Sequence, residues 1–478
     1  MVFLKNLSFG GRDVAWNKDA PNTVLIGSPG TGKTLLLRML MRSMLFDRRG
    51  RLAARAVVHD PKREMFPVLV GMGVRPDQIR IVHPLDARSK PWNIAADFRD
   101  PSSALELATL LIPRRKQSGT NDFFYNGARS IVQSVVTTLQ ERAPCAWTLN
   151  DLFEICPVRD AIKLVLKEVP DRLKRIEPYL NEGKAGDSVL STVESELAQF
   201  MAIAPANHRA LQRDGLLQGA APGQDDGSLR RWLHGTKHGV LLISAHPDHE
   251  EAVGPFNNAV IASLSRYVLG QEDNPDEHTF FFIDEARTEY PLPKLDRLVR
   301  QGRSKRAHVV TVFHTYEGMK GVYGEVADEL MGASLNVGLT STNSPDTRRW
   351  ALNLVGVGPG VNVRAAKGLV DSWFNQMGTP SVRDGIDGIF KVAGRSPWFG
   401  HASPRYVSKR LAPTAVREPG FVEVDQRDCA RLSLSDSGAL ERLGVKVEED
   451  ASNPVEIDPK LAARIAVLTT LPRQFRVL

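Results

Sequence analysis

A run of eight residues near the N-terminus has the types and spacing of a phosphate-binding loop. It fits the pattern G-x-x-x-x-G-K-[ST] and stands between a short β-branched run and a helical pattern, the context that this loop requires. Its glycines allow backbone N–H groups to point at phosphate oxygens, at a helix N-terminus that already favours anions. Lys33 can reach the β- and γ-phosphates, and the Thr34 hydroxyl can ligate Mg²⁺. The sequence therefore predicts a site for ATP and Mg²⁺ formed by Gly27, Ser28, Pro29, Gly30, Thr31, Gly32, Lys33 and Thr34.

A phosphate-binding loop needs an acidic partner on a neighbouring strand, and the sequence offers one pair. Four apolar residues, 280–283, lead directly into Asp284 and Glu285. Asp284 at the strand end would hold the Mg²⁺ shell, and Glu285 would polarise the attacking water as general base. The alternative is that both acids lie in a solvated turn at the end of the strand.

A basic segment follows this pair. Between Arg287 and Arg306 there are seven basic residues and two acids. An arginine presented from this edge would complete the ATP site of a neighbouring subunit and stabilise charge on the transferred phosphoryl group. Arg303 is the first candidate, with Arg300 and Arg306 behind it. The alternative is an ordinary solvated charged face.

Two further polar residues end predicted strands. His314 follows the apolar run 308–313, where a polar side chain would sense the γ-phosphate, although a lone histidine is also consistent with a structural role. Asp60 follows 56–58 in the series Asp-Pro-Lys, and it either caps a turn or helps to order the site from the second strand.

The elements that must position these residues are short apolar runs, each followed by a turn or a helical pattern. Fully apolar strands are typical of a parallel sheet covered on both faces, and their alternation with helices indicates an α/β doubly wound fold. The expected strands are 24–26, 56–58, 79–82, 240–243, 280–283, 308–313 and 335–340.

Between residues 101 and 231 the pattern changes, because leucine and alanine recur at helical spacing and strand signals almost vanish. We expect an all-α subdomain inserted into the sheet domain. The predicted organisation is 1–100 and 232–357 for the two parts of the nucleotide-binding domain, 101–231 for the insertion, and 358–478 for a Gly/Pro-rich, basic C-terminal extension.

Composition narrows the class of protein. The chain has 478 residues, 42% hydrophobic and 24% charged, with a net charge of +7, as is ordinary for a globular protein of several domains. No apolar run approaches the length of about 18 to 20 residues that a spanning helix needs. The three scattered cysteines do not suggest a disulfide framework or a zinc site, and they fit a reducing cytosol.

A second basic segment, residues 388–417, contains no acid and interleaves six basic residues with four aromatic ones, Phe390, Trp398, Phe399 and Tyr406. Basic groups that track phosphates and aromatics that stack on bases are what single-strand binding uses. The alternative is a basic surface whose aromatics belong to the core.

The ordered series of segments resembles the conjugative coupling ATPases of type IV secretion systems, within the HerA/FtsK-like hexameric DNA pumps. The resemblance covers roughly residues 20 to 357. It is carried by 27–34, 57–62, 83–86, 91–93, 122–124, 128–129, 231–233, 283–285, 302–304, 322–324 and 344–347.

This resemblance implies a RecA-like motor domain, an inserted all-α domain that engages DNA and substrate, and a ring, with six subunits expected. It also implies DNA as a partner, together with relaxase or secretion-channel proteins. Arg303 falls at the family's arginine finger, and His314 falls where the family usually carries a sensor glutamine. The family usually begins with transmembrane helices, but this chain reaches its phosphate-binding loop by residue 27 without one. We therefore expect a cytoplasmic protein that contacts the membrane through a partner, or a soluble DNA pump with another task.

Two hypotheses follow. The first is an ATPase that translocates DNA, and the second is a nucleotide-gated adaptor that recruits protein cargo through its helical insertion. The pair Asp284 and Glu285 favours the first, because a pure switch needs no general base.

Overall fold

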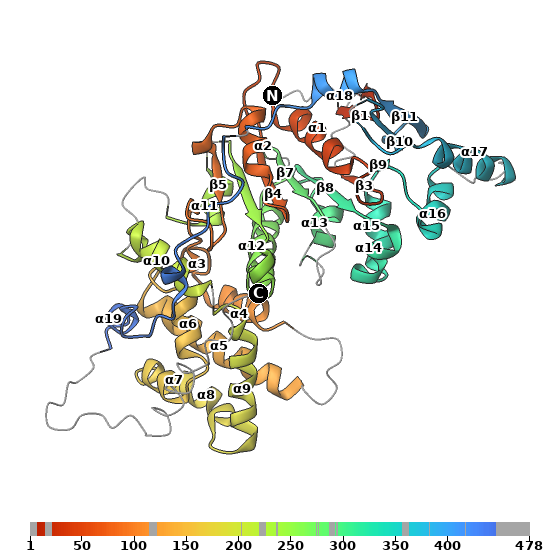
Figure 1. Ribbon diagram of the computed structural model, residues 1–478. Coiled ribbons are helices and arrows are strands. Elements are labelled where there is room, and N and C mark those ends of the chain that lie inside the picture. Colours follow the sequence, from red (N-terminus) through yellow and green to blue (C-terminus); the bar gives the residue numbers. More distant parts are fainter. Residues whose placement is uncertain are drawn as a thin grey trace, which may run out of the picture.

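In the computed structural model the chain forms a sheet domain with a helical lobe attached to one end (Figure 1). The structure describes residues 7–14, 22–113, 122–201, 203–218, 226–235, 238–273, 275, 277–285, 292, 295–355, 363–381, 383–415 and 417–445.

The sheet domain is built on a nine-stranded sheet with the order β11-β10-β9-β3-β8-β7-β4-β6-β5. All pairs from β9 to β5 are parallel, whereas β10 pairs antiparallel with β9 and with β11. The parallel strands confirm every strand that the sequence predicts. The bounds are β3 (Thr23–Ile26), β4 (Arg55–Asp60), β5 (Ile79–Ile81), β6 (Val240–Ser244), β7 (Thr279–Ile283), β8 (Ala307–Phe313), β9 (Asn336–Leu339), β10 (Ile386–Lys391) and β11 (Trp398–Ala402).

Both faces of the sheet are covered, which explains why its central strands are largely apolar. On β7, Phe280 and Phe282 belong to one hydrophobic core, while Phe281 and Ile283 belong to the other. The first core includes α1 (Lys33–Leu45) and α2 (Met65–Met72), and the second includes α12 (Glu250–Leu269). Successive side chains of a strand point to opposite faces, so a doubly covered strand shows no polar alternation. The mixed α/β architecture is the predicted one.

The regular elements that the structure describes between residues 101 and 231 are all helices, and most of them form the lobe below the sheet in Figure 1. The long helix α5 lies at its centre, with Ile131, Val132 and Val135 completely buried. The helices are α4 (Pro101–Leu111), α5 (Asp122–Arg142), α6 (Leu149–Ile155), α7 (Arg159–Leu166), α8 (Pro170–Leu180), α9 (Lys184–Ala198), α10 (Ala204–Arg213) and α11 (Leu229–His234). The division of the chain into separate domains at these bounds stays a prediction.

The remaining strands and α-helices in the described part of the chain are one hairpin and eight further α-helices. A hairpin of β1 (Leu7–Phe9) and β2 (Arg12–Val14) precedes β3. The other helices are α3 (Ile94–Asp97), α13 (Leu295–Gln301), α14 (Tyr316–Tyr323), α15 (Val326–Ala333), α16 (Pro345–Val355), α17 (Val363–Gln376), α18 (Pro404–Arg410) and α19 (Ala439–Arg442).

The aromatic residues of the segment 388–417 pack within the protein. Phe390 is completely buried, with its ring 5.0 Å from that of Phe9 and 5.9 Å from that of Trp398. The Tyr406 hydroxyl donates to the Arg12 carbonyl. Phe390 therefore cannot stack on a base in this arrangement, and the structure supports core aromatics for this part of the segment.

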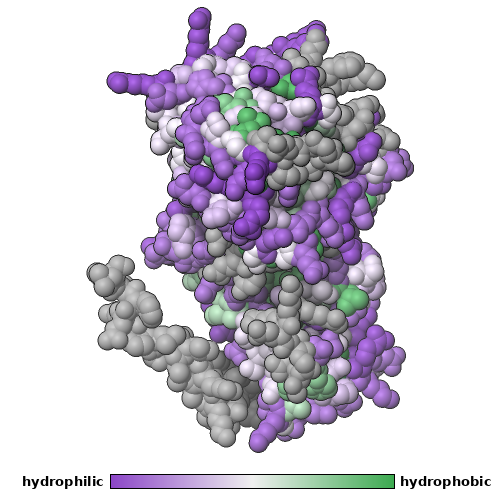
Figure 2. All heavy atoms as spheres, turned by 90° about the vertical axis from the view of Figure 1, so that its right-hand side faces the viewer, coloured by the Kyte–Doolittle hydropathy of each residue, from purple (hydrophilic) through white to green (hydrophobic). Residues whose placement is uncertain are grey.

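No helix in the described ranges combines the length and the apolar character that crossing a membrane would require. The face shown in Figure 2 is covered mainly by hydrophilic side chains, among which the hydrophobic areas are small and separate.

After α18 the chain forms what we call the C-terminal strap, residues 413–415 and 417–443, which runs from the sheet domain to the helical lobe (Figure 1). Ala415 N donates to the carbonyl of Pro67 in α2 (2.9 Å). Farther along, Val424 N donates to Leu85 O (3.1 Å), and Ala87 N donates to Val422 O (2.7 Å). The strap then reaches the lobe, so it contacts both parts of the molecule.

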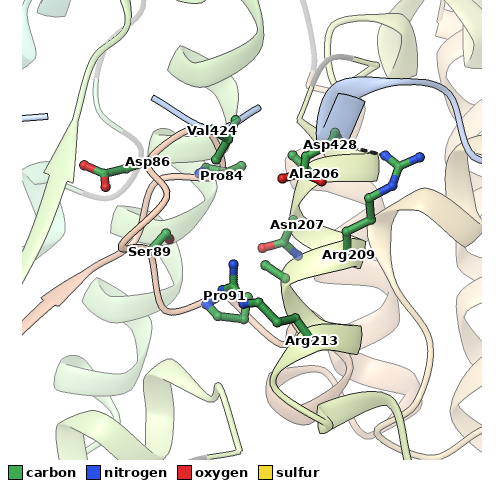
Figure 3. A pocket seen from close by; sticks show the side chains of 11 residues that line it. Pro84, Asp86, Ser89, Pro91, Ala206, Asn207, Arg209, Arg213, Val424 and Asp428 are labelled. Carbon is green, nitrogen blue, oxygen red and sulfur yellow. Dashed lines mark hydrogen bonds between the residues drawn. The ribbon is translucent and has the colours of Figure 1, made fainter. Parts of the chain in front are cut away.

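Where the strap meets α10, a small pocket of about 120 Å³ remains (Figure 3). Arg209 crosses from α10 to donate to the backbone carbonyls of Asp428 and Ala430. The pocket thus marks a joint between three segments that lie far apart in the sequence.

A histidine buried beneath the C-terminal strap should make the stability of the fold depend on pH. His83 is fully buried, its Nδ1 accepts from Leu85 N (3.1 Å), and its ring lies 5.0 Å from that of Phe421. Burial lowers the pKa of His83 from 6.5 to about 3, although Asp86 opposes the shift. The unfolded chain takes up this proton at higher pH than the folded chain, so protons favour unfolding. We expect the free energy of unfolding to fall as the pH drops from 6.5 toward 3, by up to about 1.4 kcal/mol per pH unit from this group.

Urea unfolding at a series of pH values tests this expectation. His83→Asn keeps an acceptor for Leu85 N but does not titrate, so its stability should depend less steeply on pH than that of the wild type. Equal slopes for the two proteins would contradict the assignment.

Candidate functional site

The phosphate-binding loop joins β3 to α1 and curls around the side chain of Lys33. Lys33 Nζ donates to the carbonyls of Gly27 (2.6 Å) and Ser28 (2.8 Å). Gly30 and Gly32 have φ values of 75° and 88°, a region that glycine enters without strain. No side chain caps the start of α1, and its first turn contains no acid. The positive end of the helix dipole therefore faces the loop, which suits a polyphosphate anion.

The Lys33 ammonium group is held in a site that disfavours its charge. Its side chain is buried, and burial lowers the pKa of Lys33 to about 8. The Asp284 carboxylate opposes this shift, whereas the positive charge of Lys62 adds to it. An anionic ligand in this place would provide the countercharge that the protein alone supplies only in part.

The two residues predicted to hold Mg²⁺, Thr34 and Asp284, come from different elements and lie close together. Thr34 Oγ1, on the first turn of α1, lies 3.5 Å from Asp284 Oδ2, at the end of β7. Asp284 is 5% exposed, and burial raises its pKa. His59, on the neighbouring strand β4, contacts the Asp284 backbone carbonyl through Nδ1 (3.2 Å). A hydroxyl and a carboxylate oxygen at this spacing are the hard ligands that Mg²⁺ prefers.

Glu285 and His314 are held together beside Lys33. His314 Nε2 lies 3.0 Å from Glu285 Oε1, and its Nδ1 lies 3.3 Å from Lys33 Nζ. An ammonium group can only donate, so Nδ1 accepts and Nε2–H donates to the carboxylate. Glu285 has a φ of 53°, an unusual conformation for a non-glycine residue and one that often marks functional sites. The histidine thus links the lysine of the loop to the candidate general base.

These groups surround one cleft of about 290 Å³ at the carboxyl ends of the parallel strands. The cleft brings together the loop, both acids and His314, as the sequence predicts. Its lining residues are Pro29, Gly30, Gly32, Lys33, Thr34, Leu35, Lys62, Asp284, Glu285, Val312, Phe313 and His314. Lys62 is a charged residue of this cleft that the sequence prediction does not include. The sequence feature that could have indicated it is the series Asp-Pro-Lys after an apolar strand.

Asp60 has a local role at the start of that series. Its Oδ2 accepts from Met65 N (2.7 Å) at the start of α2, which is a turn-capping contact. Burial raises the pKa of Asp60 to about 6, and the nearby Asp284 carboxylate adds to the shift. The carboxylate thus holds the turn that carries Lys62.

Arg303 lies apart from the cleft of its own chain. It is exposed on the turn that precedes β8, whereas the cleft lies at the other end of this strand, near His314. Arg300 pairs with Asp296 and with Glu329 (both 2.8 Å), as expected for a solvated charged face. Of the other basic residues, Arg287 and Lys294 lie outside the described residues. Arg303 therefore does not line the cleft of its own chain.

The sheet and the cleft define the class of protein, a RecA-like α/β protein with a phosphate-binding loop. The chain belongs to the type IV secretion-system coupling proteins, because the model of their DNA-binding domain family matches residues 6–358. It is similar to the coupling protein TraD of Escherichia coli (strain K12), with 23% identity over 326 residues that make up 67% of this chain and 42% of TraD. The chain thus spans about two fifths of the length of TraD.

Solved structures of another coupling protein share the fold. The conjugative coupling protein TrwBdeltaN70 in complex with sulphate has a TM-score of 0.64 and 19% identity. TrwB in complex with ADP and Mg²⁺ has a TM-score of 0.62 and 18% identity, and in both comparisons 88% of this chain and 92% of the other are covered.

Proposed function

We propose that this protein is an ATP-driven motor that moves DNA, or a nucleoprotein substrate, during conjugative transfer. The observation that carries the proposal is the single cleft in which Lys33, Thr34, Asp284, Glu285 and His314 meet. A protein that used ATP only as a switch would need the loop but not an acid held beside it in a strained conformation. The TrwB complexes with ADP and Mg²⁺ and with a non-hydrolysable ATP analogue support a nucleotide as the ligand.

Each of the residues in the cleft has its own role in ATP hydrolysis. The loop and Lys33 bind and orient the phosphates. Thr34 and Asp284 would hold Mg²⁺, which would neutralise charge on the phosphate oxygens when bound. Glu285 accepts a proton from the attacking water. His314, in contact with both Glu285 and Lys33, is placed to respond to the presence of the terminal phosphate.

A ring completes this mechanism. Because Arg303 lies at the edge of the sheet opposite its own cleft, we propose that it enters the cleft of a neighbouring subunit and stabilises the transferred phosphoryl group. A closed ring of six copies would give every cleft such an arginine. Recruitment to the inner face of the membrane, and contacts with relaxase or channel proteins, would then occur through partners of the ring.

ATP hydrolysis measured with and without single- and double-stranded DNA, over a salt series, tests the proposal. We expect DNA to stimulate hydrolysis and salt to weaken the effect steeply, because each neutralised phosphate releases counterions. Lys33→Ala should reduce the rate by at least about 100-fold, since it removes a charge directed at the phosphates. Full stimulation of Lys33→Ala would contradict the motor. Nucleotide binding without DNA-stimulated turnover would instead favour the nucleotide-gated adaptor.

A further inference from the structure

Lys62 is a third basic group at the cleft besides Lys33 and His314, and the mechanism above does not use it. It follows β4, the strand that pairs with β7 on the side away from β8. The side chain is exposed, and within the described part of the chain it enters no ion pair. Its charge is nevertheless close enough to lower the pKa of Asp284, against the effect of burial. Lys62 thus presents an uncommitted positive charge to the cleft.

The backbone that carries Lys62 is held on both sides. Asp60 anchors the turn through Met65 N, and Arg63 has a φ of 58°. The C-terminal strap packs against the same turn, because the Arg63 guanidinium lies 4.7 Å from the centre of the Phe421 ring. Gly420 approaches so closely that an added Cβ would lie 2.0 Å from Arg63 O. The base of the Lys62 side chain is therefore fixed, while its end remains available for a ligand.

The order of groups along the sheet edge indicates which part of a nucleotide Lys62 would meet. The loop lies at β3, His314 follows β8, the two acids follow β7, and Lys62 follows β4. A phosphate-binding loop cradles the α- and β-phosphates, so a phosphate chain that extends from the loop along this edge ends near the acids and Lys62. Asp284 and Glu285 lie at that end, so a terminal phosphate there meets negative charge that Mg²⁺ on Asp284 would offset only in part. Lys62 places a further positive charge beside the two acids.

We propose that Lys62 binds the terminal phosphate of the nucleotide, so that the cleft distinguishes a triphosphate from a diphosphate. This inference rests on the proposed nucleotide-binding function. It assigns to the Asp-Pro-Lys turn a contact with the terminal phosphate in addition to the one expected of Lys33.

Equilibrium binding of ADP and of the non-hydrolysable ATP analogue, both with Mg²⁺, tests the proposal on the full chain. We expect Lys62→Met to weaken binding of the analogue by about tenfold or more, the effect of losing a hydrogen bond to a charged group. ADP affinity should change by less than about twofold, and Lys62→Arg should restore most of the preference for the analogue. Lys174→Met, an exposed lysine on α8 away from the cleft, is the matched control for loss of one positive charge.

The outcomes separate this inference from the function on which it rests. If the wild type binds neither nucleotide, the proposed function fails. If the wild type binds both and Lys62→Met weakens neither, or weakens both equally, the role of Lys62 is overturned and nucleotide binding stands. Thermal unfolding of the variant checks the fold, which should be intact because Lys62 is exposed.

Discussion

Glu285→Gln is expected to lower the rate of ATP hydrolysis by about 100- to 10,000-fold, the range that a positioned general base contributes, while nucleotide affinity stays near that of the wild type. The carboxylate lines the cleft and accepts from His314 Nε2 (3.0 Å). A glutamine has nearly the same shape, but its amide cannot take a proton from water. The loss should therefore appear in kcat and spare binding.

Single-turnover hydrolysis and equilibrium binding with Mg²⁺ measure the two effects separately. Glu194→Gln, an exposed residue on α9, is the matched control for the loss of one carboxylate. Hydrolysis by Glu285→Gln at the wild-type rate would show that another group activates the water. It would also favour the alternative in which Glu285 belongs to an ordinary turn.

Arg442→Ala is expected to reduce the free energy of unfolding by about 3 kcal/mol, as is typical when one partner of a buried ion pair is removed. Arg442 Nη2 donates to both oxygens of Asp151 (3.0 and 2.9 Å), and the Asp151 side chain is only 2% exposed. Without the arginine, this carboxylate stays buried without its countercharge. The substitution would also release the end of the C-terminal strap from the helical lobe.

Urea unfolding and hydrogen exchange of the strap amides measure these two consequences. The matched control is Arg431→Ala, because Arg431 also pairs with a buried acid of α6, Glu154, but is itself 54% exposed. We expect Arg431→Ala to lower the free energy of unfolding by less than Arg442→Ala does, because solvent already screens the pair of Arg431 and Glu154. A larger loss for Arg431→Ala than for Arg442→Ala would contradict the assignment of Arg442 as the principal anchor of the strap.

The local parts of the site and the central fold could be predicted from the sequence. The residues of the phosphate-binding loop are contiguous in the chain. Its glycines and its lysine shape and contact backbone only a few residues away, so residue types and spacing are enough to predict the loop. The helical pattern that follows the loop forms α1. Strands buried on both faces are recognisable because nearly every residue is apolar, and for this reason the strands from β3 to β9 were all found.

The two antiparallel strands at one end of the sheet could not be predicted in this way. β10 and β11 carry partly exposed residues among buried ones, and short half-exposed strands rich in glycine differ little from a loop in sequence. They become strands because β9 offers an open edge to β10, and this edge exists only once the sheet has formed. The contacts of the aromatic residues in this segment could not be predicted from the sequence either. Whether Phe390 stacks on a base or on Phe9 depends on a partner that lies 381 positions away in the chain, at residue 9 against residue 390.

The sequence by itself determined that this chain carries a phosphate-binding loop, a following acid pair and an α/β core, because each of these depends on neighbouring residues. Only the tertiary structure decided that His314 joins Lys33 to Glu285, that Lys62 lines the same cleft, and that Arg303 lies at the far edge. These relations depend on the order of strands in the sheet, which differs from their order in the chain. Several adjacent strands, such as β5 and β6, are separated by long helical segments, and no local pattern records which of them will pair.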